Sequence, residues 1–224
     1  MLLHIRAVLS PETLQAVQKM LEQAVYVDGR RSAGREAAGV KHNQELAADD
    51  PLRAQLDRLV MGTLVQHPRY QAAVLPLRVA GAFYARYQAG MNYGFHVDDP
   101  VMGPMQGRYR SDVSTTVFLN DAGDYDGGEL VLRTPLGEQA VKGAAGDAVI
   151  YPSSYWHRVA DVRSGTRLVA VTWAQSMVRS PEQRELLYQL ALAREGVMEQ
   201  LAGSEVAANL STAYANLVRM WSEV

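Results

Sequence analysis

The polarity pattern of the chain changes twice along its length. Apolar residues first recur every three to four positions, as on one face of an amphipathic helix. From about residue 78 to residue 177 the pattern becomes short alternating or continuous apolar runs separated by Gly, Asp and Pro, which is typical of strands. Helical spacing then returns. This pattern predicts a mainly β domain with flanking helices.

Two helices are expected before the β-rich region. The first covers residues 11–25, because Ser10 is a favoured capping residue and a proline follows it at the first helical position. The second begins near Asp50 and is expected to end at His67, where the next residue is proline. Both helices should pack on the sheet, so residues 1–77 are assigned to an N-terminal support region.

The segment between these helices, residues 28–45, has three glycines, four Lys or Arg side chains and little periodicity. It is expected to be a loop. Most such segments are solvated connections, but loops on a rigid scaffold also carry substrate contacts, so this one is a candidate lid. Whether residues 28–45 and 99–110 close over a site is a question that the sequence leaves open.

The β-rich region should form a single domain from residue 78 to residue 177. Seven or eight short strands without intervening helices indicate a sandwich or barrel, and the jelly roll is the member of this class that commonly houses a metal site. The expected strands are residues 79–88, 113–119, 129–133, 138–142, 147–151, 157–162 and 167–173.

Residues 178–224 are predicted to form a C-terminal helical extension. Ser180 begins a capping pattern, and Gly203 separates two helical stretches of apolar residues. Such stripes usually serve internal packing. A homodimer contact through these helices is the alternative.

The composition narrows the classes of partner. The chain is 48% hydrophobic and 21% charged with a formal net charge of −2, so it has no basic excess for nucleic acid. It has no cysteine, and any metal must therefore be bound by His, Asp or Glu. The start of the chain lacks the layout of a signal peptide, and no apolar run has the length of a membrane span. A cytoplasmic location without membrane contact is expected.

Two histidines and an aspartate form a candidate metal site. His96 and Asp98 are two positions apart, so on a strand both side chains point to the same side. His157 follows after several further strands. Two imidazoles and one carboxylate are the facial triad that binds non-haem Fe(II) and leaves coordination positions open. His4, His42 and His67 have no partner at ligand spacing and are interpreted as ordinary core or surface histidines.

Arg167 is a candidate for binding an anion. It begins a strongly apolar stretch, where a buried guanidinium needs an anionic partner to offset its desolvation. A dicarboxylate co-substrate would supply that anion. The alternative is an arginine at the start of its strand, exposed to water.

The motifs also occur in a characteristic order, and the ordered set is more specific than any one motif. They are Tyr87-x-x-Gly90, His96-x-Asp98, Thr116-Val-Phe-Leu-Asn120, Gly127-Gly-Glu-Leu130, Gly146-Asp-Ala148, Trp156-His157, Arg167 ten residues later, and Trp173. The chain thereby resembles the Fe(II)/2-oxoglutarate dioxygenases of the prolyl 4-hydroxylase-like superfamily. It is more closely similar to the bacterial PKHD-type hydroxylases associated with iron uptake. Ala33-Gly34 and Lys41-His-Asn-Gln44 look like a further signature of that family.

The resemblance implies a fold and a set of roles. The core would be a double-stranded β-helix, with Fe²⁺ held by His96, Asp98 and His157. The distal carboxylate of 2-oxoglutarate would pair with Arg167, and the hydroxyl of Tyr87 would help to hold this co-substrate. One departure is Phe118, which stands where some prolyl hydroxylases have a second co-substrate tyrosine and cannot form that hydrogen bond.

The function implied is a dioxygenase that uses O₂ and 2-oxoglutarate to hydroxylate an unidentified peptidyl side chain or small molecule. Succinate and CO₂ would be released, L-ascorbate would restore oxidised iron, and the activity would be linked to iron uptake. The main alternative is a non-enzymatic iron-binding jelly roll, a sensor or small-molecule binder, which would have no use for Arg167. A third reading, a helical interaction module, depends only on the C-terminal apolar stripe.

Overall fold

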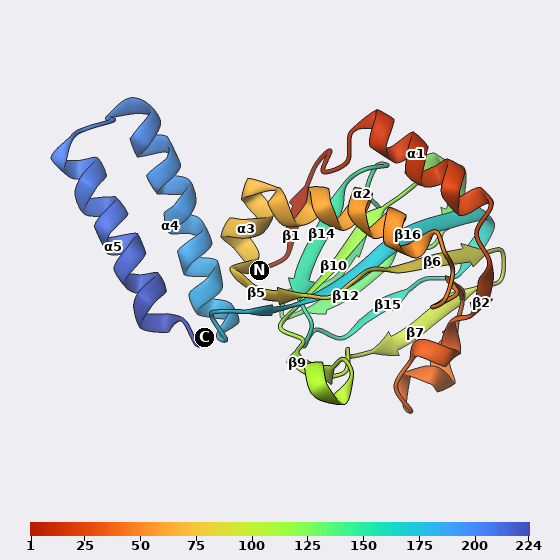
Figure 1. Ribbon diagram of the computed structural model, residues 1–224. Helices are drawn as coiled ribbons and strands as arrows, with labels where there is room; N and C mark the ends of the chain where they lie inside the picture. The colour runs from red at the N-terminus through yellow and green to blue at the C-terminus, as the bar shows by residue number, and fades with distance from the viewer.

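Two antiparallel sheets packed face to face form the centre of the protein in the computed structural model, which describes residues 1–224 (Figure 1). The larger sheet has the order β1 (Leu3–Ile5), β14 (Ala148–Pro152), β10 (Val113–Phe118), β16 (Val162–Ser176), β6 (Phe83–Gln88), β4 (Gln44–Leu46) and β2 (Tyr26–Asp28), and β5 (Pro76–Val79) and β11 (Tyr125–Gly127) also pair with β16. The smaller sheet has the order β13 (Gly137–Val141), β12 (Leu130–Thr134), β15 (His157–Val159), β7 (Asn92–His96) and β3 (Lys41–His42). The prediction of a mainly β, jelly-roll core with flanking helices is confirmed.

The long strand β16 organises the larger sheet. It pairs with β10 on one side and with β6 on the other. Because side chains alternate along a strand, Leu168 and Ala170 face the helices, while Val169 and Arg167 face the space between the two sheets. The strand thereby belongs to the hydrophobic core on one face and to the interior of the jelly roll on the other.

Three helices cover the outer face of the larger sheet: α1 (Pro11–Glu22), α2 (Arg53–Gln66) and α3 (Pro68–Val74) (Figure 1). They bury apolar side chains such as Val17, Leu56 and Leu64 against the sheet in a cluster of 21 buried residues. Burial of one such side chain contributes about 1.5–3 kcal/mol, so this layer supports the sheet from behind.

The helix α3 was not expected, and α1 ends at Glu22 rather than at residue 25. His67-Pro68 does end α2, as predicted, but the same two residues also begin α3. His67 Nδ1 accepts a hydrogen bond from the Arg69 amide at 3.2 Å, and Pro68 occupies the first helical position.

The expectation of a loop over residues 28–45 is wrong for much of the segment. It contains two 3₁₀ turns, Gly29–Ser32 and Ala37–Val40, followed by β3 and the start of β4. The inward positions of these strands are polar, so the alternation of apolar residues that usually marks a strand is missing.

Two strand boundaries also differ from the prediction. The run expected over residues 79–88 is two strands, β5 and β6. The strand expected over residues 167–173 extends over 15 residues as β16, which places Arg167 in its interior rather than at its start.

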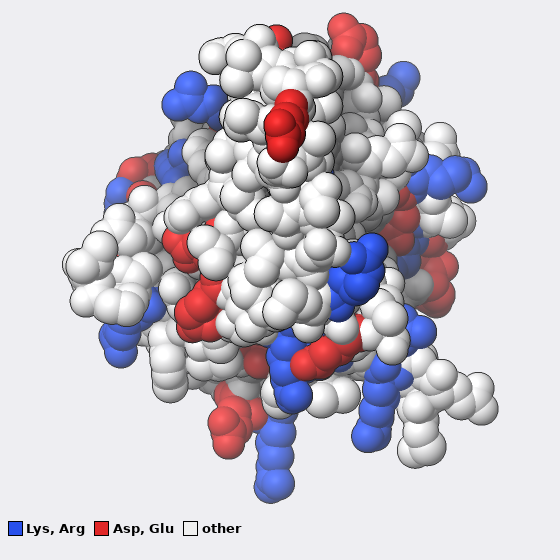
Figure 2. All heavy atoms as spheres, turned by 90° about the vertical axis from the view of Figure 1, so that its left-hand side faces the viewer, with Lys and Arg blue, Asp and Glu red and all other residues white.

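The C-terminal helices α4 (Pro181–Gln200) and α5 (Glu205–Trp221) form a hairpin that projects from one side of the β core (Figure 1). Ser180 caps α4, as predicted: its Oγ accepts from the Gln183 amide at 3.2 Å. The outward side of this hairpin is largely uncharged (Figure 2), with Val206 and Met220 exposed. The homodimer contact stays a prediction. None of the helices is both long and apolar enough to cross a membrane.

Candidate metal centre

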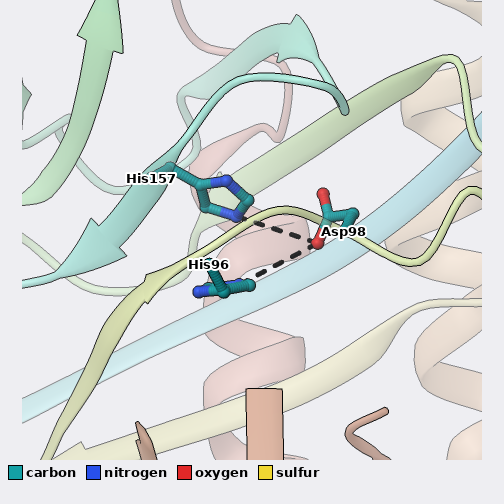
Figure 3. A group of neighbouring side chains, drawn as sticks. All are labelled: His96, Asp98 and His157. Atoms are coloured by element: carbon teal, nitrogen blue, oxygen red, sulfur yellow. Dashed lines mark ion pairs between the residues drawn. The ribbon is translucent and has the colours of Figure 1, made fainter. Parts of the chain in front are cut away.

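His96 and His157 lie directly opposite each other on neighbouring strands. His96 ends β7 and His157 begins β15, and the two residues are register partners. Asp98 follows β7 by two residues and turns back toward both rings (Figure 3). Its Oδ1 lies 4.0 Å from His96 Nε2 and 3.7 Å from His157 Nε2. The ligand atoms of all three side chains lie within 4.8 Å of one another, a spacing that leaves room for an ion between them.

The backbone fixes the orientation of both imidazoles. His96 Nδ1 lies 2.8 Å from the Gly94 carbonyl oxygen, and His157 Nδ1 lies 2.9 Å from that of Tyr155. A carbonyl only accepts, so each Nδ1 carries the hydrogen and each Nε2 presents its lone pair to the site. This is the arrangement that metal-binding histidines require.

The carboxylate of Asp98 is held by serines that the sequence did not single out. Ser114 Oγ on β10 donates to Asp98 Oδ2 at 2.5 Å, and lies 2.7 Å from Ser153 Oγ. This leaves Oδ1 free to face the two imidazoles. A serine inside an apolar strand has no distinctive spacing, so only the structure reveals this support.

An aromatic stack holds His96 from the side. The Tyr93 ring lies parallel to the His96 ring with centroids 3.7 Å apart, and Lys41 Nζ lies 5.2 Å from the Tyr93 centroid. Burial, and secondarily the neighbouring His157, lowers the pKa of His96 to about 4. His96 is therefore neutral at pH 7, the form in which an imidazole binds a metal.

A cavity of about 640 Å³ extends from these three residues into the space between the sheets. Arg167 lies in its wall, and only 1% of the residue is exposed. Its Nε and Nη1 have no hydrogen-bond partner in the protein. The alternative of a water-exposed arginine at the start of a strand is therefore wrong.

Tyr87 lies beside Arg167, as expected for residues that share one site. The two are register partners on β6 and β16, and the guanidinium carbon lies 5.0 Å from the Tyr87 ring centroid. Burial raises the pKa of Tyr87 to about 12, so its hydroxyl keeps its proton and is available as a donor at pH 7.

All five residues singled out in the sequence thus line one cavity: His96, Asp98, His157, Arg167 and Tyr87. The other three histidines lie outside the cavity. His4 Nε2 lies 2.7 Å from Asp147 Oδ2, His67 caps α3, and His42 is exposed.

Both candidate lid segments contribute to the cavity wall. Gly34 and Ala37 come from the first, and Met102 and Pro104 come from the second. The second segment contains a small hairpin of β8 (Val101–Met102) and β9 (Tyr109–Arg110). Phe83, Val171 and Trp173 supply an apolar wall on the larger sheet. Closure of either segment stays a prediction.

Comparison with known families agrees with this geometry. Residues 82–175 match the 2OG-Fe(II) oxygenase superfamily, and residues 182–223 match the PKHD-type hydroxylase C-terminal domain. The chain is 50% identical over 224 residues to a PKHD-type hydroxylase of Thioalkalivibrio sulfidiphilus, and 39% identical to one of Shewanella sp. strain ANA-3, with all of each chain covered.

Solved structures share the fold at low sequence identity. A prolyl-4-hydroxylase of Pseudomonas putida matches with a TM-score of 0.56 and 17% identity, covering 78% of this chain and 92% of that one. The protein HygX of Streptomyces hygroscopicus, solved with nickel and 2-oxoglutarate bound, matches with a TM-score of 0.53 and 15% identity, covering 79% and 84%. These likenesses establish the jelly-roll fold.

Proposed function

We infer that this chain, which belongs to the PKHD-type hydroxylases of the 2OG-Fe(II) oxygenase superfamily, performs its reaction through the five residues of the cavity. His96, Asp98 and His157 would hold Fe(II), since two neutral imidazoles and a carboxylate converge on one point without bonding to one another. The bound iron supplies the O₂ chemistry that couples decarboxylation of 2-oxoglutarate, to succinate and CO₂, to hydroxylation of a C–H bond.

The observation that carries the assignment of the co-substrate is the state of Arg167. A guanidinium buried without partners on Nε and Nη1 is costly unless a ligand provides acceptors. The distal carboxylate of 2-oxoglutarate has the charge and planar shape that a guanidinium binds well. Tyr87, which lines the same cavity, would donate a further hydrogen bond to this co-substrate.

The charges of the cavity fit the same pair of ligands. The charged side chains that line it are Lys41, Arg53, Glu45, Asp98, Asp99 and Arg167, three of each sign. Fe(II) adds two positive charges and 2-oxoglutarate adds two negative charges, so together they leave the balance unchanged. This neutrality favours joint binding, because an unpaired charge inside a protein is costly.

Phe118 does not supply the hydroxyl found at this place in some prolyl hydroxylases. Its ring lies 5.9 Å from the guanidinium carbon of Arg167 and is almost fully buried. It therefore shields the arginine from water, and shielding strengthens an ion pair with the co-substrate.

Further parts of the proposal concern the wider reaction. The substrate would be a peptidyl side chain or a small molecule, and L-ascorbate would return oxidised iron to Fe(II). The activity would be linked to iron uptake, and the protein would be cytoplasmic. The apolar wall of Phe83, Val171 and Trp173 would pack against the substrate.

Anaerobic titration of the Fe(II)-loaded protein with 2-oxoglutarate tests the assignment. The expected result is the weak visible charge-transfer band of a chelated keto acid in the wild type, and no band in Asp98→Ala. If iron binds and no band forms in the wild type at any co-substrate concentration, the assignment is wrong and the iron-sensor reading gains support.

A further inference from the structure

The short segment that contains β3 and β4 closes one end of the jelly roll. β3 pairs with β7 of the smaller sheet, and two residues later β4 pairs with β6 of the larger sheet. Alternate side chains of this crossing point the same way. Lys41, Asn43 and Glu45 accordingly all line the cavity.

Two of these three side chains satisfy each other. Lys41 Nζ donates to Glu45 Oε1 at 2.5 Å and to Ser32 Oγ at 2.9 Å, and both members of the ion pair are buried. The pair is neutral as a whole. The carboxylate of Glu45 is therefore compensated and does not leave a net negative charge on this wall.

Asn43 is different, because its carboxamide makes no hydrogen bond of normal geometry within the protein. The residue is 3% exposed, and neither its Oδ1 nor its Nδ2 has a hydrogen-bond partner. A buried polar group without a hydrogen bond costs about 1–3 kcal/mol. Most buried polar groups in native proteins therefore have a hydrogen-bond partner. A ligand in the cavity would supply the hydrogen-bond partner that Asn43 lacks.

Packing on Gly29 orients the carboxamide. The Gly29 amide donates to the Asn43 carbonyl oxygen at 3.0 Å, and a Cβ at Gly29 would lie only 1.9 Å from Asn43 Oδ1. Glycine is thus required for the side-chain oxygen to rest there. The Nδ2 donor is at the other end of the carboxamide from Gly29, and the carboxamide acts on the Tyr87 hydroxyl.

Asn43 also lies next to the residues assigned to the co-substrate. Burial raises the pKa of the Tyr87 hydroxyl, and the charge of Arg167 and, to a smaller extent, the carboxamide of Asn43 lower it in part. Donors on Arg167, Tyr87 and Asn43 therefore face one region of the cavity, and a ligand rich in acceptors would satisfy them together.

We propose that Asn43 is a co-substrate-binding residue whose Nδ2–H group donates to a carboxylate oxygen of 2-oxoglutarate, beside Tyr87. The inference rests on the proposed function. Carboxylate oxygens only accept, which suits the Nδ2 donor of Asn43. It also gives a binding role to the Lys41-His-Asn-Gln44 motif.

Two substitutions of different character test the proposal. Asn43→Ala removes the donor, and Asn43→Asp keeps the shape but replaces the donor with a negatively charged acceptor. In the anaerobic Fe(II) titration we expect Kd for 2-oxoglutarate to rise about 10-fold in Asn43→Ala and about 50-fold or more in Asn43→Asp, since hydrogen bonds to charged groups contribute about 1.5–3 kcal/mol.

The controls separate binding from folding. Affinity for Mn²⁺ alone should stay unchanged in both variants, because Asn43 is not a metal ligand. Asn216→Ala, at an asparagine on α5 far from the cavity, should match the wild type in every measurement.

The outcomes distinguish the inference from the function on which it rests. Absence of the band in the wild type would defeat the proposed function itself. A normal band with unchanged Kd in both Asn43 variants would overturn only the inference. Equal losses in the two variants, together with weaker Mn²⁺ binding, would also overturn it, because they would mean that Asn43 only supports the local fold.

Discussion

Two arginines are almost completely buried in this protein, Arg184 at 4% exposure and Arg167 at 1%. Arg184 donates from Nη1 to the carbonyl oxygens of Val178 and Arg179, at 2.7 and 2.8 Å, and from Nη2 to that of Asp112 at 3.4 Å. It fastens α4 to the β core. Arg167 has the same chemistry and burial, but its Nε and Nη1 are unpaired.

The difference shows that burial by itself does not mark a functional charge. Arg167 differs because its Nε and Nη1 have no hydrogen-bond acceptor in the protein and its side chain lines a cavity. The two kinds of His–Asp contact show the same difference between a paired and an unpaired group. His4 and Asp147 are in direct hydrogen-bond contact at 2.7 Å, whereas Asp98 Oδ1 lies 3.7 and 4.0 Å from its two imidazoles. A satisfied pair stabilises the fold, and an incomplete one is ready for a ligand.

The largest effect is expected from Arg167→Met. Loss of a buried charged partner should weaken 2-oxoglutarate binding about 100-fold or more, because truncating one partner of such a pair costs about 2–5 kcal/mol. The melting temperature of the ligand-free protein should stay the same or rise, since an unpaired buried charge is removed. The charge-transfer titration and a thermal melt measure the two quantities. A variant that binds 2-oxoglutarate normally would contradict the comparison.

Arg184→Met should show the reverse pattern. Three carbonyl oxygens lose their donor, so the free energy of unfolding should fall by about 2 kcal/mol. The affinity for 2-oxoglutarate should not change. Chemical denaturation with urea provides the first value and the same titration the second. If this variant lost co-substrate affinity while remaining folded, the distinction between the two arginines would fail.

Ser114→Ala tests the incomplete His–Asp cluster at a smaller scale. Removal of the hydroxyl that holds Asp98 Oδ2 should weaken metal binding about 10-fold, as is typical for groups that orient a ligand. Equilibrium dialysis with Mn²⁺ measures this. The matched control is His4→Gln, which disturbs a satisfied pair and should lower stability without affecting metal affinity.

The smallest effect is expected from Phe118→Tyr. A hydroxyl near Arg167 would restore the donor that this position lacks, and one additional hydrogen bond contributes about 0.5–1.5 kcal/mol. We expect Kd for 2-oxoglutarate to fall about 3-fold in the same titration. Weaker binding in this variant would indicate that shielding by the phenylalanine ring matters more than an added donor.

Much of the fold was predictable from apolar periodicity. The two long N-terminal helices, the longer strands of the core and the C-terminal hairpin have apolar residues at regular spacing, so their hydrophobic faces are visible in the sequence. Helix α3 was not predicted because His67-Pro68 is compatible both with the end of one helix and with the start of another. Only packing against the sheet decides that the chain uses both.

The site was predictable where residue types are rare and their spacing is fixed. His96 and Asp98 are two residues apart where strand β7 ends, and His96 lies opposite His157 through the pairing of β7 with β15. Asn43 and Ser114 could not be found in this way. Asparagine and serine are common, and the segment of β3 and β4 that contains Asn43 points polar side chains into the cavity, so hydropathy classifies it as a loop.

Strand β16 contributes side chains both to the cavity and to the hydrophobic core of the domain. It carries Arg167 and Trp173 on the face toward the cavity and Ala170 and Ala174 on the face toward the helices. A single inserted residue would exchange these faces for everything that follows. An insertion in this strand would therefore disrupt both faces, whereas an insertion at the exposed Leu136, in the β12–β13 turn, would leave the cavity and the core in place.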